Sequence, residues 1–386
     1  MKDAARELET AEVSRAGRLA CFCPPGVAMA GARPAGLAGG LFHLAAGFAL
    51  AVLSQTLATS LLPLAGRWLA PQPSLMAAPY MAMLIGAAVA TFPASFLLDA
   101  FGRRASFALG ASHGLAGGLM MAWALSAGAF WPFCLGAFWL GVAQGFTLFY
   151  RHEAAIGQSL QQKSLAIALV FGAGAFAGLV GPALLLALDY ASPATRNIAV
   201  ALAAALAQVL VLTVAMSSAP GAPATLVENA GGISPQDYLA ATVIAAAAWF
   251  GMTAQMLAMP GAMVGCGVAL SGMFGLMAFH VMAMYAPAFV VGPLAARFGV
   301  LSVAAFGLGL MVCARLLTPG ADSATDFALV LGLLAVGWSL ATSAATLWLH
   351  HRGSPSRLWL AGHDALLFVA ALAGAAMAAR PMIGLQ

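Results

Sequence analysis

Long apolar stretches, separated by short polar or charged segments, dominate the chain from about residue 37 onward. As helices, stretches of about 18 residues or more are long enough to cross roughly 30 Å of hydrocarbon. They lack the alternation of barrel strands, so the pattern predicts transmembrane helices. Eleven spans are expected, near residues 38–64, 74–98, 104–126, 130–150, 164–189, 195–217, 238–259, 267–295, 299–317, 326–348 and 359–379.

The composition supports the same interpretation. Hydrophobic residues make up 62% of the 386 residues and charged residues only 7%, whereas a soluble domain carries about 25% charged residues. Too few charged side chains are present to cover a surface that faces water. The expected fold class is therefore an all-α polytopic membrane protein in contact with the lipid bilayer. The formal net charge of +4 gives no ground for a nucleic-acid partner.

The distribution of Lys and Arg predicts the orientation of the helices. With the N-terminus in the cytosol, 12 of the 16 basic residues lie on the cytosolic side, and four face outward: Arg67, Arg196, Arg315 and Arg380. Cytosolic loops of membrane proteins carry such an excess of basic residues. We therefore expect a cytosolic N-terminus, with residues 1–36 as a cytosolic tail.

An internal repeat divides the chain into two related halves. The segments 95–102 and 292–299 lie 197 positions apart, and each ends the second span of a half. The repeat predicts an N-terminal half of six helices at 37–217, a cytosolic loop at 218–237 and a C-terminal half of five helices at 238–386. A counterpart of the sixth span would fall beyond Gln386, so the twelfth helix of a complete repeat is expected to be missing.

The loop after the second span carries a recognisable motif. The segment Asp99-Ala-Phe-Gly102-Arg103-Arg104 resembles the signature loop of the major facilitator superfamily, and Gly178 to Pro182 is similar to a Gly-Pro motif of its fifth helix. The resemblance implies the major facilitator fold, in a bacterial inner membrane, with two halves that rock about a site near the midplane. One departure is Gly141, which stands where another family motif has an arginine that serves proton coupling.

The same loop is the predicted conformational latch. Gly102 permits a tight turn, and Asp99 at a helix end can pair with a cation or with a helix N-terminus. Arg357, just before the eleventh span, is the candidate partner from the other half. In the alternative interpretation Asp99 is only hydrated, and Arg103 and Arg104 only anchor the topology.

Ionisable residues inside a membrane are costly to bury and are usually functional. His363 and Asp364 in the eleventh span are therefore candidates for coupling transport to an ion. Asp364 lies only one or two turns from the cytosolic end, so snorkelling or helix capping is an alternative role. His43 and His113 stand alone in their spans, and for them we expect a packing role.

Methionines concentrate in the seventh and eighth spans, where eight of the 19 fall between residues 252 and 284. Met252 and Met256 lie on one helical face, and His280 and Met284 on another, because residues four apart share a face. Thioether sulfurs with an imidazole suit a soft metal, above all Cu(I). Methionine also fills irregular gaps in cores, so packing is the alternative.

These two pairs carry a second resemblance. Met252-Thr-Ala-Gln-Met256 and His280-Val-Met-Ala-Met284 resemble the Met-x-x-x-Met and His-x-x-x-Met motifs of a copper-importing branch of the superfamily. That branch supplies copper for assembly of cbb3-type cytochrome c oxidase. The resemblance implies copper import, with the four residues as transient ligands, copper as cargo and no permanent cofactor.

Two other functions remain open from the sequence. One is a permease for a small organic solute, because a methionine-lined apolar cavity would serve it equally well. The other is a membrane assembly factor that transports nothing. An enzyme is not expected, because the sequence offers no nucleophile–base set and no phosphate-binding loop.

Overall fold

The computed structural model describes residues 37–191, 195–218 and 232–383, and all of their regular secondary structure is helical. The predicted tail at 1–36 and most of the predicted loop at 218–237 lie outside the described residues. Contacts divide the chain into a unit of residues 1–37 and a unit of residues 38–386. The second unit contains the fold described below.

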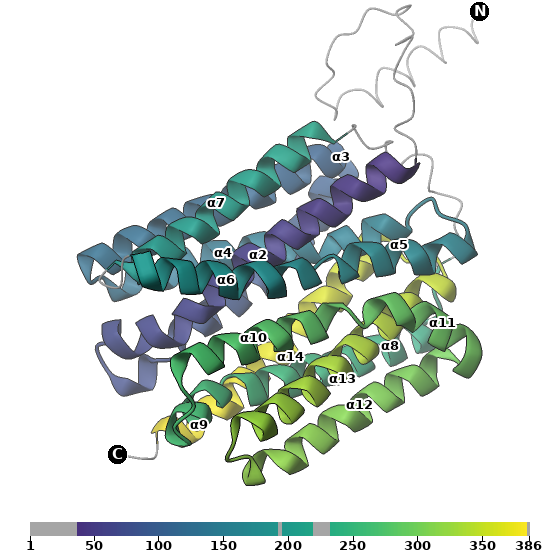
Figure 1. Cartoon of the computed structure of the whole chain (residues 1–386). Coiled ribbons are helices and arrows are strands. Elements are labelled where there is room, and N and C mark those ends of the chain that lie inside the picture. The colour runs from purple at the N-terminus through teal and green to yellow at the C-terminus, as the bar shows by residue number, and fades with distance from the viewer. Residues whose placement is uncertain (1–36, 192–194, 219–231, 384–386) are drawn as a thin grey trace, which may run out of the picture. The chain divides into compact units, whose positions relative to one another are not determined.

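The N-terminal half forms one helical bundle (Figure 1). Its long helices pack along one another, and α3 contacts both α4 and α7. The elements are α2 (Leu37–Leu69), η1 (Pro73–Leu75), α3 (Ala78–Ala127), α4 (Phe130–Ala155), α5 (Leu160–Gly172), α6 (Ala175–Ala191) and α7 (Arg196–Ser217).

The C-terminal half forms a second bundle beside the first, drawn in green to yellow in Figure 1. Helix α13 lies against α8, α10 and α12, and α14 packs along α8. The elements are α8 (Pro235–Met256), α9 (Met259–Gly265), α10 (Leu270–Tyr285), α11 (Ala288–Phe298), α12 (Val300–Leu317), η3 (Thr318–Gly320), α13 (Ala324–His351) and α14 (Arg357–Ile383).

Helix α3 is two antiparallel membrane spans joined at Gly102. This residue has φ 77° and ψ 178°, a conformation that favours glycine. Gly86, before the turn, lies against Phe138 of α4, and Gly117, after it, lies against Gly136 of the same helix. Both parts of α3 therefore run along α4, which requires the chain to reverse between them. The turn that the sequence predicted at Gly102 is present.

The number of spans agrees with the sequence prediction. Within the described residues, nine helical segments are long and apolar enough to cross a membrane, and the bent pair α10–α11 makes a tenth. Because the segment that contains α3 holds two spans, the total is eleven. The predicted all-helical fold with two related halves is confirmed.

Two spans that the sequence predicted as continuous are broken, and the seventh span is followed by a short additional helix. Helix α5 is followed by α6, α8 by α9, and α10 by α11 with a bend of 42°. Pro260 and Pro287 lie at two of these breaks, where proline removes a backbone donor and restricts the preceding residue. Length and hydropathy alone do not reveal such breaks, because the apolar stretch continues through them.

Small residues bring the helices close together. A side chain at Gly141 would collide with the backbone oxygen of Met83, and one at Gly174 would lie 2.6 Å from the ring of Tyr285 in the other bundle. Close approach through glycine is typical of membrane helices. The missing arginine at position 141 thus has a steric reason, since no larger side chain fits there.

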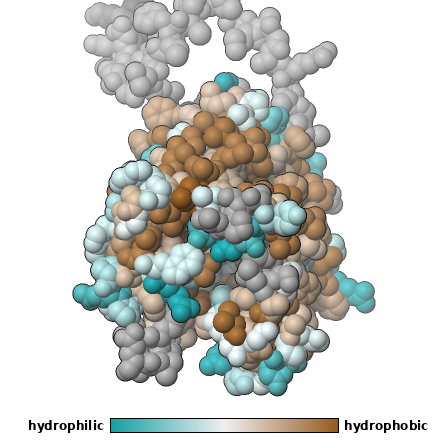
Figure 2. All heavy atoms as spheres, turned by 60° about the vertical axis from the view of Figure 1, so that its left-hand side comes forward, coloured by the Kyte–Doolittle hydropathy of each residue, from teal (hydrophilic) through white to brown (hydrophobic). Residues whose placement is uncertain are grey.

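The outer surface is apolar, as expected for contact with lipid. Large exposed hydrophobic side chains occur on both bundles, with Phe42 70%, Phe306 62% and Leu316 73% exposed. In Figure 2, hydrophobic residues form broad brown areas of the visible surface. Exposed apolar area of this extent is rare in soluble proteins and marks a surface that lipid covers.

Candidate functional site

A cavity of about 100 Å³ lies between the two bundles. Seven helices form its wall, four from the N-terminal half and three from the C-terminal half. Its position between two pseudo-repeated halves is the expected place for a transported solute. The lining residues are Phe48, Val52, Gln55, Tyr80, Met83, Leu84, Gln144, Thr147, Leu148, Phe171, Trp249, Met252, Thr253, Met284, Tyr285 and Trp338.

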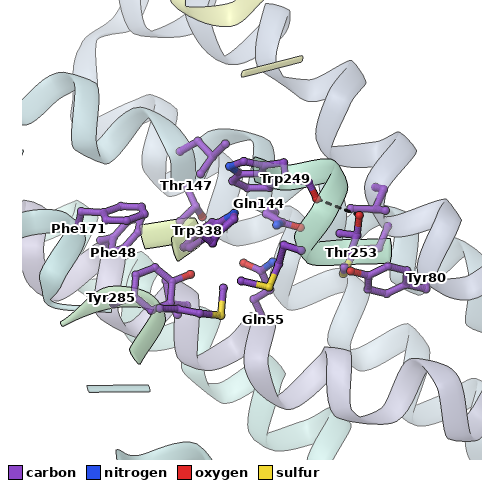
Figure 3. A pocket seen from close by; sticks show the side chains of 16 residues that line it. Phe48, Gln55, Tyr80, Gln144, Thr147, Phe171, Trp249, Thr253, Tyr285 and Trp338 are labelled. Carbon is purple, nitrogen blue, oxygen red and sulfur yellow. Dashed lines mark hydrogen bonds between the residues drawn. The ribbon is translucent and has the colours of Figure 1, made fainter. Parts of the chain in front are cut away.

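Aromatic rings form much of the cavity wall (Figure 3). The ring centroids of Phe171 lie 5.2 Å from Tyr285 and 5.8 Å from Trp338, and Phe48 lies 5.6 Å from Phe171. Trp249 and Trp338 are 5.6 Å apart. These rings come from both halves, so a flat aromatic ligand would find faces and edges to stack against on either side.

Three fully buried polar atoms of the cavity wall have no hydrogen-bond partner within the described part of the chain. They are Oε1 of Gln144 and Nε1 of Trp249 and of Trp338, and the three side chains are 6%, 8% and 3% exposed. Buried polar groups are normally paired, because leaving one unpaired costs about 1–3 kcal/mol. Two donors and one acceptor thus remain for a ligand that offers both kinds of group.

The sixteen lining residues include no Asp, Glu, Lys, Arg or His. Two hydroxyl groups of the wall are already engaged in hydrogen bonds. The hydroxyl of Thr253 donates to the carbonyl of Ala371 at 2.8 Å, and that of Thr147 to the carbonyl of Ala143 at 2.9 Å. An unbalanced charge on a buried ligand would lack a counter-ion here, which favours a neutral ligand.

The predicted copper ligands are only partly brought together. Met252 and Met284 line the cavity, whereas Met256 and His280 are not among its lining residues. His280 is buried, its Nδ1 donates to the carbonyl of Leu331 at 3.0 Å, and its Nε2 has no partner among the described residues. The same residues contain no group of three or more His, Cys, Asp or Glu side chains placed to hold a metal ion. The four-residue copper set stays a prediction.

One end of the two bundles, which we call the basic end, gathers Arg103, Arg151, Lys163, Arg352 and Arg357 near the ends of their helices. Salt bridges there join the two halves. Nη1 of Arg357 lies 2.6 Å from Oδ1 of Asp99, the pairing suggested from the sequence. Gly102 provides the turn beside this pair, and Arg104 is exposed. The latch function itself stays a prediction.

Glu153 is a member of this network that the sequence did not single out. Its Oε1 lies 2.6 Å from Nε of Arg357, and its Oε2 lies 2.6 Å from Nε of Arg103. The carboxylate is fully buried, so it depends on these two guanidinium groups. The sequence does show Glu153 as an acidic residue near the end of an apolar span. It was overlooked because the orientation was predicted from Lys and Arg alone.

Asp364 is also fully buried, so the snorkelling role that the sequence left open is wrong. Its Oδ1 lies 2.6 Å from Nη2 of Arg151 on α4. His152 approaches the same carboxylate and also contacts His350 of α13. His363, the other coupling candidate, bonds the hydroxyl of Thr242 at 2.9 Å. His152 and His350 were missed because their approach depends on the packing of distant helices.

Comparison with known sequences gives one informative relative. No family model matches the sequence. The chain is similar to the riboflavin transporter RfnT of Brucella anthropi, with 31% identity over 307 residues and 77% of each chain covered. This level of identity over most of both chains indicates shared family membership.

Solved transporter structures share the fold at low sequence identity. The human organic anion transporter MFSD10 matches with a TM-score of 0.66 and 15% identity, covering 89% of this chain and 92% of that one. The xylose transporter XylE of E. coli matches with a TM-score of 0.61 and 12% identity, covering 90% and 97%. At these identities the likeness concerns the fold alone.

Proposed function

This chain belongs to the major facilitator superfamily of membrane transporters, and we propose that it carries a small, neutral, planar aromatic solute, with riboflavin as the first candidate. The observation that carries the proposal is the cavity wall, in which aromatic rings surround unpaired polar atoms and no charge. The 31% identical relative, named as a riboflavin transporter, supports the choice of solute. The small-solute permease of the sequence analysis thus replaces copper import as the leading function.

The chemistry of riboflavin matches the cavity wall. Its ring system is flat and aromatic, and stacking on rings such as Phe171 and Trp338 contributes about 0.5–1.5 kcal/mol for each pair. One edge of the ring system carries two carbonyls and an N–H group. The indole N–H groups of Trp249 and Trp338 suit the carbonyls, and Oε1 of Gln144 suits the N–H group.

Because the cavity wall carries no charge, it should discriminate between riboflavin and its phosphate ester, flavin mononucleotide. The nearest cation along α4 is Arg151, one turn beyond the lining residue Thr147, and its guanidinium is bonded to Asp364. A phosphate ester would bring about two negative charges into a wall without a counter-ion, at high cost. We therefore propose that the neutral vitamin is accepted and that flavin mononucleotide is rejected.

Transport follows from alternating exposure of this cavity. In the proposed orientation the basic end faces the cytoplasm of a bacterial inner membrane, because cytoplasmic loops are rich in basic residues. The salt bridges of Arg357 with Asp99 and Glu153 hold that end closed in the arrangement described. Breaking them as the halves rock would open the cavity toward the cytoplasm.

A binding titration tests the proposal. Riboflavin fluorescence is quenched when its ring system stacks on indole or phenol rings, so purified protein should quench it in a saturable way. In equilibrium dialysis with radiolabelled riboflavin, an excess of unlabelled riboflavin should displace the label from the protein, and flavin mononucleotide at the same concentration should not. Unsaturable quenching, or equal competition by the phosphate ester, would refute the proposed recognition.

Copper import is the second candidate. It is favoured by the sulfur atoms of Met252 and Met284 in the cavity wall and by the unpaired Nε2 of His280. Replacing Met with Leu keeps volume and removes sulfur, so Met252→Leu and Met284→Leu should lower accumulation of radioactive copper if thioethers are ligands. Met120→Leu and Met121→Leu in α3 are the controls. Equal copper uptake in all four variants would reject this candidate.

A further inference from the structure

Five buried side chains at the contact between the two bundles form a cluster that carriage of a neutral solute does not itself require. None is more than 4% exposed. We call this group the buried ionisable cluster, and it consists of Arg151, His152, His350, His363 and Asp364.

The cluster is centred on the carboxylate of Asp364 in α14. Nη2 of Arg151 lies 2.6 Å from Oδ1, and Nε2 of His152 lies 3.3 Å from Oδ2. On its other side, Nδ1 of His152 lies 3.0 Å from Nε2 of His350. Because α4 belongs to the first bundle and α13 and α14 to the second, each of these contacts joins the halves.

The geometry limits how many protons the two imidazoles can hold. Nε2 of His152 faces a carboxylate and therefore carries a hydrogen. When both rings are neutral, His350 donates from Nε2 to the bare Nδ1 of His152. One added proton on Nδ1 of His152 reverses this bond, provided that His350 moves its own hydrogen from Nε2 to Nδ1. A second added proton would make both facing nitrogens donors, and the bond would be lost.

The surrounding charges do not remove this limit. Arg151 and Asp364 neutralise each other, and Glu153 of α4 is paired with Arg103 of α3 and Arg357 of α14. Other facing groups are cationic, neutral or distant. They are Lys163 of α5, whose Nζ bonds the carbonyl of His350, His351 of α13, Tyr150 of α4, Tyr238 of α8, Tyr285 of α10 and the half-exposed Asp99 of α3.

The cluster also touches the wall of the cavity. Cζ of Arg151 lies 5.9 Å from the ring centroid of Phe171, a lining residue. Two further donors of this guanidinium, Nε and Nη1, have no partner within the described ranges. A change in the cluster therefore reaches the cavity through one side chain.

We propose that the buried ionisable cluster is a proton-binding site between the halves, whose proton content changes when the basic end opens. The closed arrangement accommodates at most one added proton on His152 and His350. Once the halves separate, water reaches both rings, and each can take a proton from acidic water on its own, because the ordinary pKa of histidine is about 6.5. Opening at the basic end is therefore accompanied by proton uptake, and closing returns that proton to the water. Acidic solution on that side favours the open arrangement.

The proposal depends on the chain being a transporter but not on the identity of its solute, so its test contains no riboflavin. The full chain, with its native cysteines replaced, carries one new cysteine at Ala155, which is fully buried at the end of α4. A matched variant carries it at Ala105, which is exposed at the same end. The rate of maleimide labelling at position 155 is divided by the rate at position 105, in membranes at pH 5.5 and at pH 7.5. This ratio reports opening, because the effect of pH on the reaction of maleimide with a thiol is common to both variants.

We expect the ratio to rise severalfold at the lower pH. His152→Gln and His350→Gln should each abolish the rise, whereas His113→Gln, outside the cluster on α3, should keep it. A ratio that is the same at both pH values in the otherwise unaltered chain would overturn the proposal without any histidine variant. A rise that persists in a correctly folded His152→Gln or His350→Gln protein would overturn it as well.

Discussion

Arg151 on α4 and Asp364 on α14 form an ion pair of 2.6 Å between the two halves, and their side chains are 1% and 0% exposed. Burying two charges is costly, and their attraction offsets that cost only while both are present. The pair therefore ties the closed arrangement to the contact between the halves.

Removing one member of this pair should strongly destabilise the protein. Asp364→Asn leaves the guanidinium of Arg151 buried without a counter-ion, for which a loss of about 3–5 kcal/mol is expected. Asp189→Asn is the control, because it breaks a partly exposed salt bridge with Arg196 and should cost less than about 1 kcal/mol. Thermal unfolding of both purified variants provides the comparison. Equal losses of stability in the two variants would show that the buried pair of Asp364 contributes no more than the partly exposed pair of Asp189.

The latch makes a prediction about energetic coupling. Asp99 and Arg357 lie 2.6 Å apart but Asp99 is half-exposed, so their coupling should be modest, up to about 1 kcal/mol. Asp99→Asn and Arg357→Gln should therefore have less than additive effects on opening at the basic end, measured by cysteine labelling. The matched pair Asp189 and Arg196, at the other end, should not change this opening. Additive effects of Asp99→Asn and Arg357→Gln would disprove the pairing.

The proposed orientation predicts which loops an external reagent reaches. Single cysteines in the loop at 70–77 should react with a membrane-impermeant maleimide applied to the periplasmic side. Cysteines at 100–104 should react only after the membrane has been permeabilised, so that the reagent reaches the cytoplasmic side. Labelling at 100–104 in intact cells would reverse the orientation.

The indole N–H of Trp338 should contribute to solute affinity. Trp338→Phe keeps an aromatic ring and removes the donor, so the KM for riboflavin should rise about fivefold, the equivalent of about 1 kcal/mol for one hydrogen bond. Trp123→Phe, at a position 58% exposed on α3, should leave the KM unchanged. A Trp338→Phe protein with unchanged KM would mean that this donor does not contact the solute.

The sequence predicted the fold well because the signals for it are local. Apolar length marks the spans, and Gly102 marks the reversal between two of them. The break at Pro287 was missed because hydropathy does not change there, whereas Pro260 lies just beyond the predicted end of the seventh span. Asp99 and Arg357 were linked through a motif, whereas nothing local links His152 to His350, which are 198 positions apart.

The lining of the cavity was also not predicted, because it too depends on contacts between residues that are distant in the sequence. Trp249 and Trp338 lie on different helices, and their unpaired N–H groups acquire meaning only once the helices pack. The methionine pattern drew the sequence analysis toward copper because residues four apart are visible along one helix. Met252 and Met284 do line the cavity, but they share its wall with aromatic residues from four other helices.

Uptake of radiolabelled riboflavin tests the central claim most directly. Cells that lack their own riboflavin uptake system, expressing this chain, should accumulate the vitamin in a saturable manner. A tenfold excess of unlabelled riboflavin should abolish that uptake, whereas the same excess of flavin mononucleotide should not. Uptake no greater than in cells without the chain, at normal protein abundance in the membrane, would contradict the account.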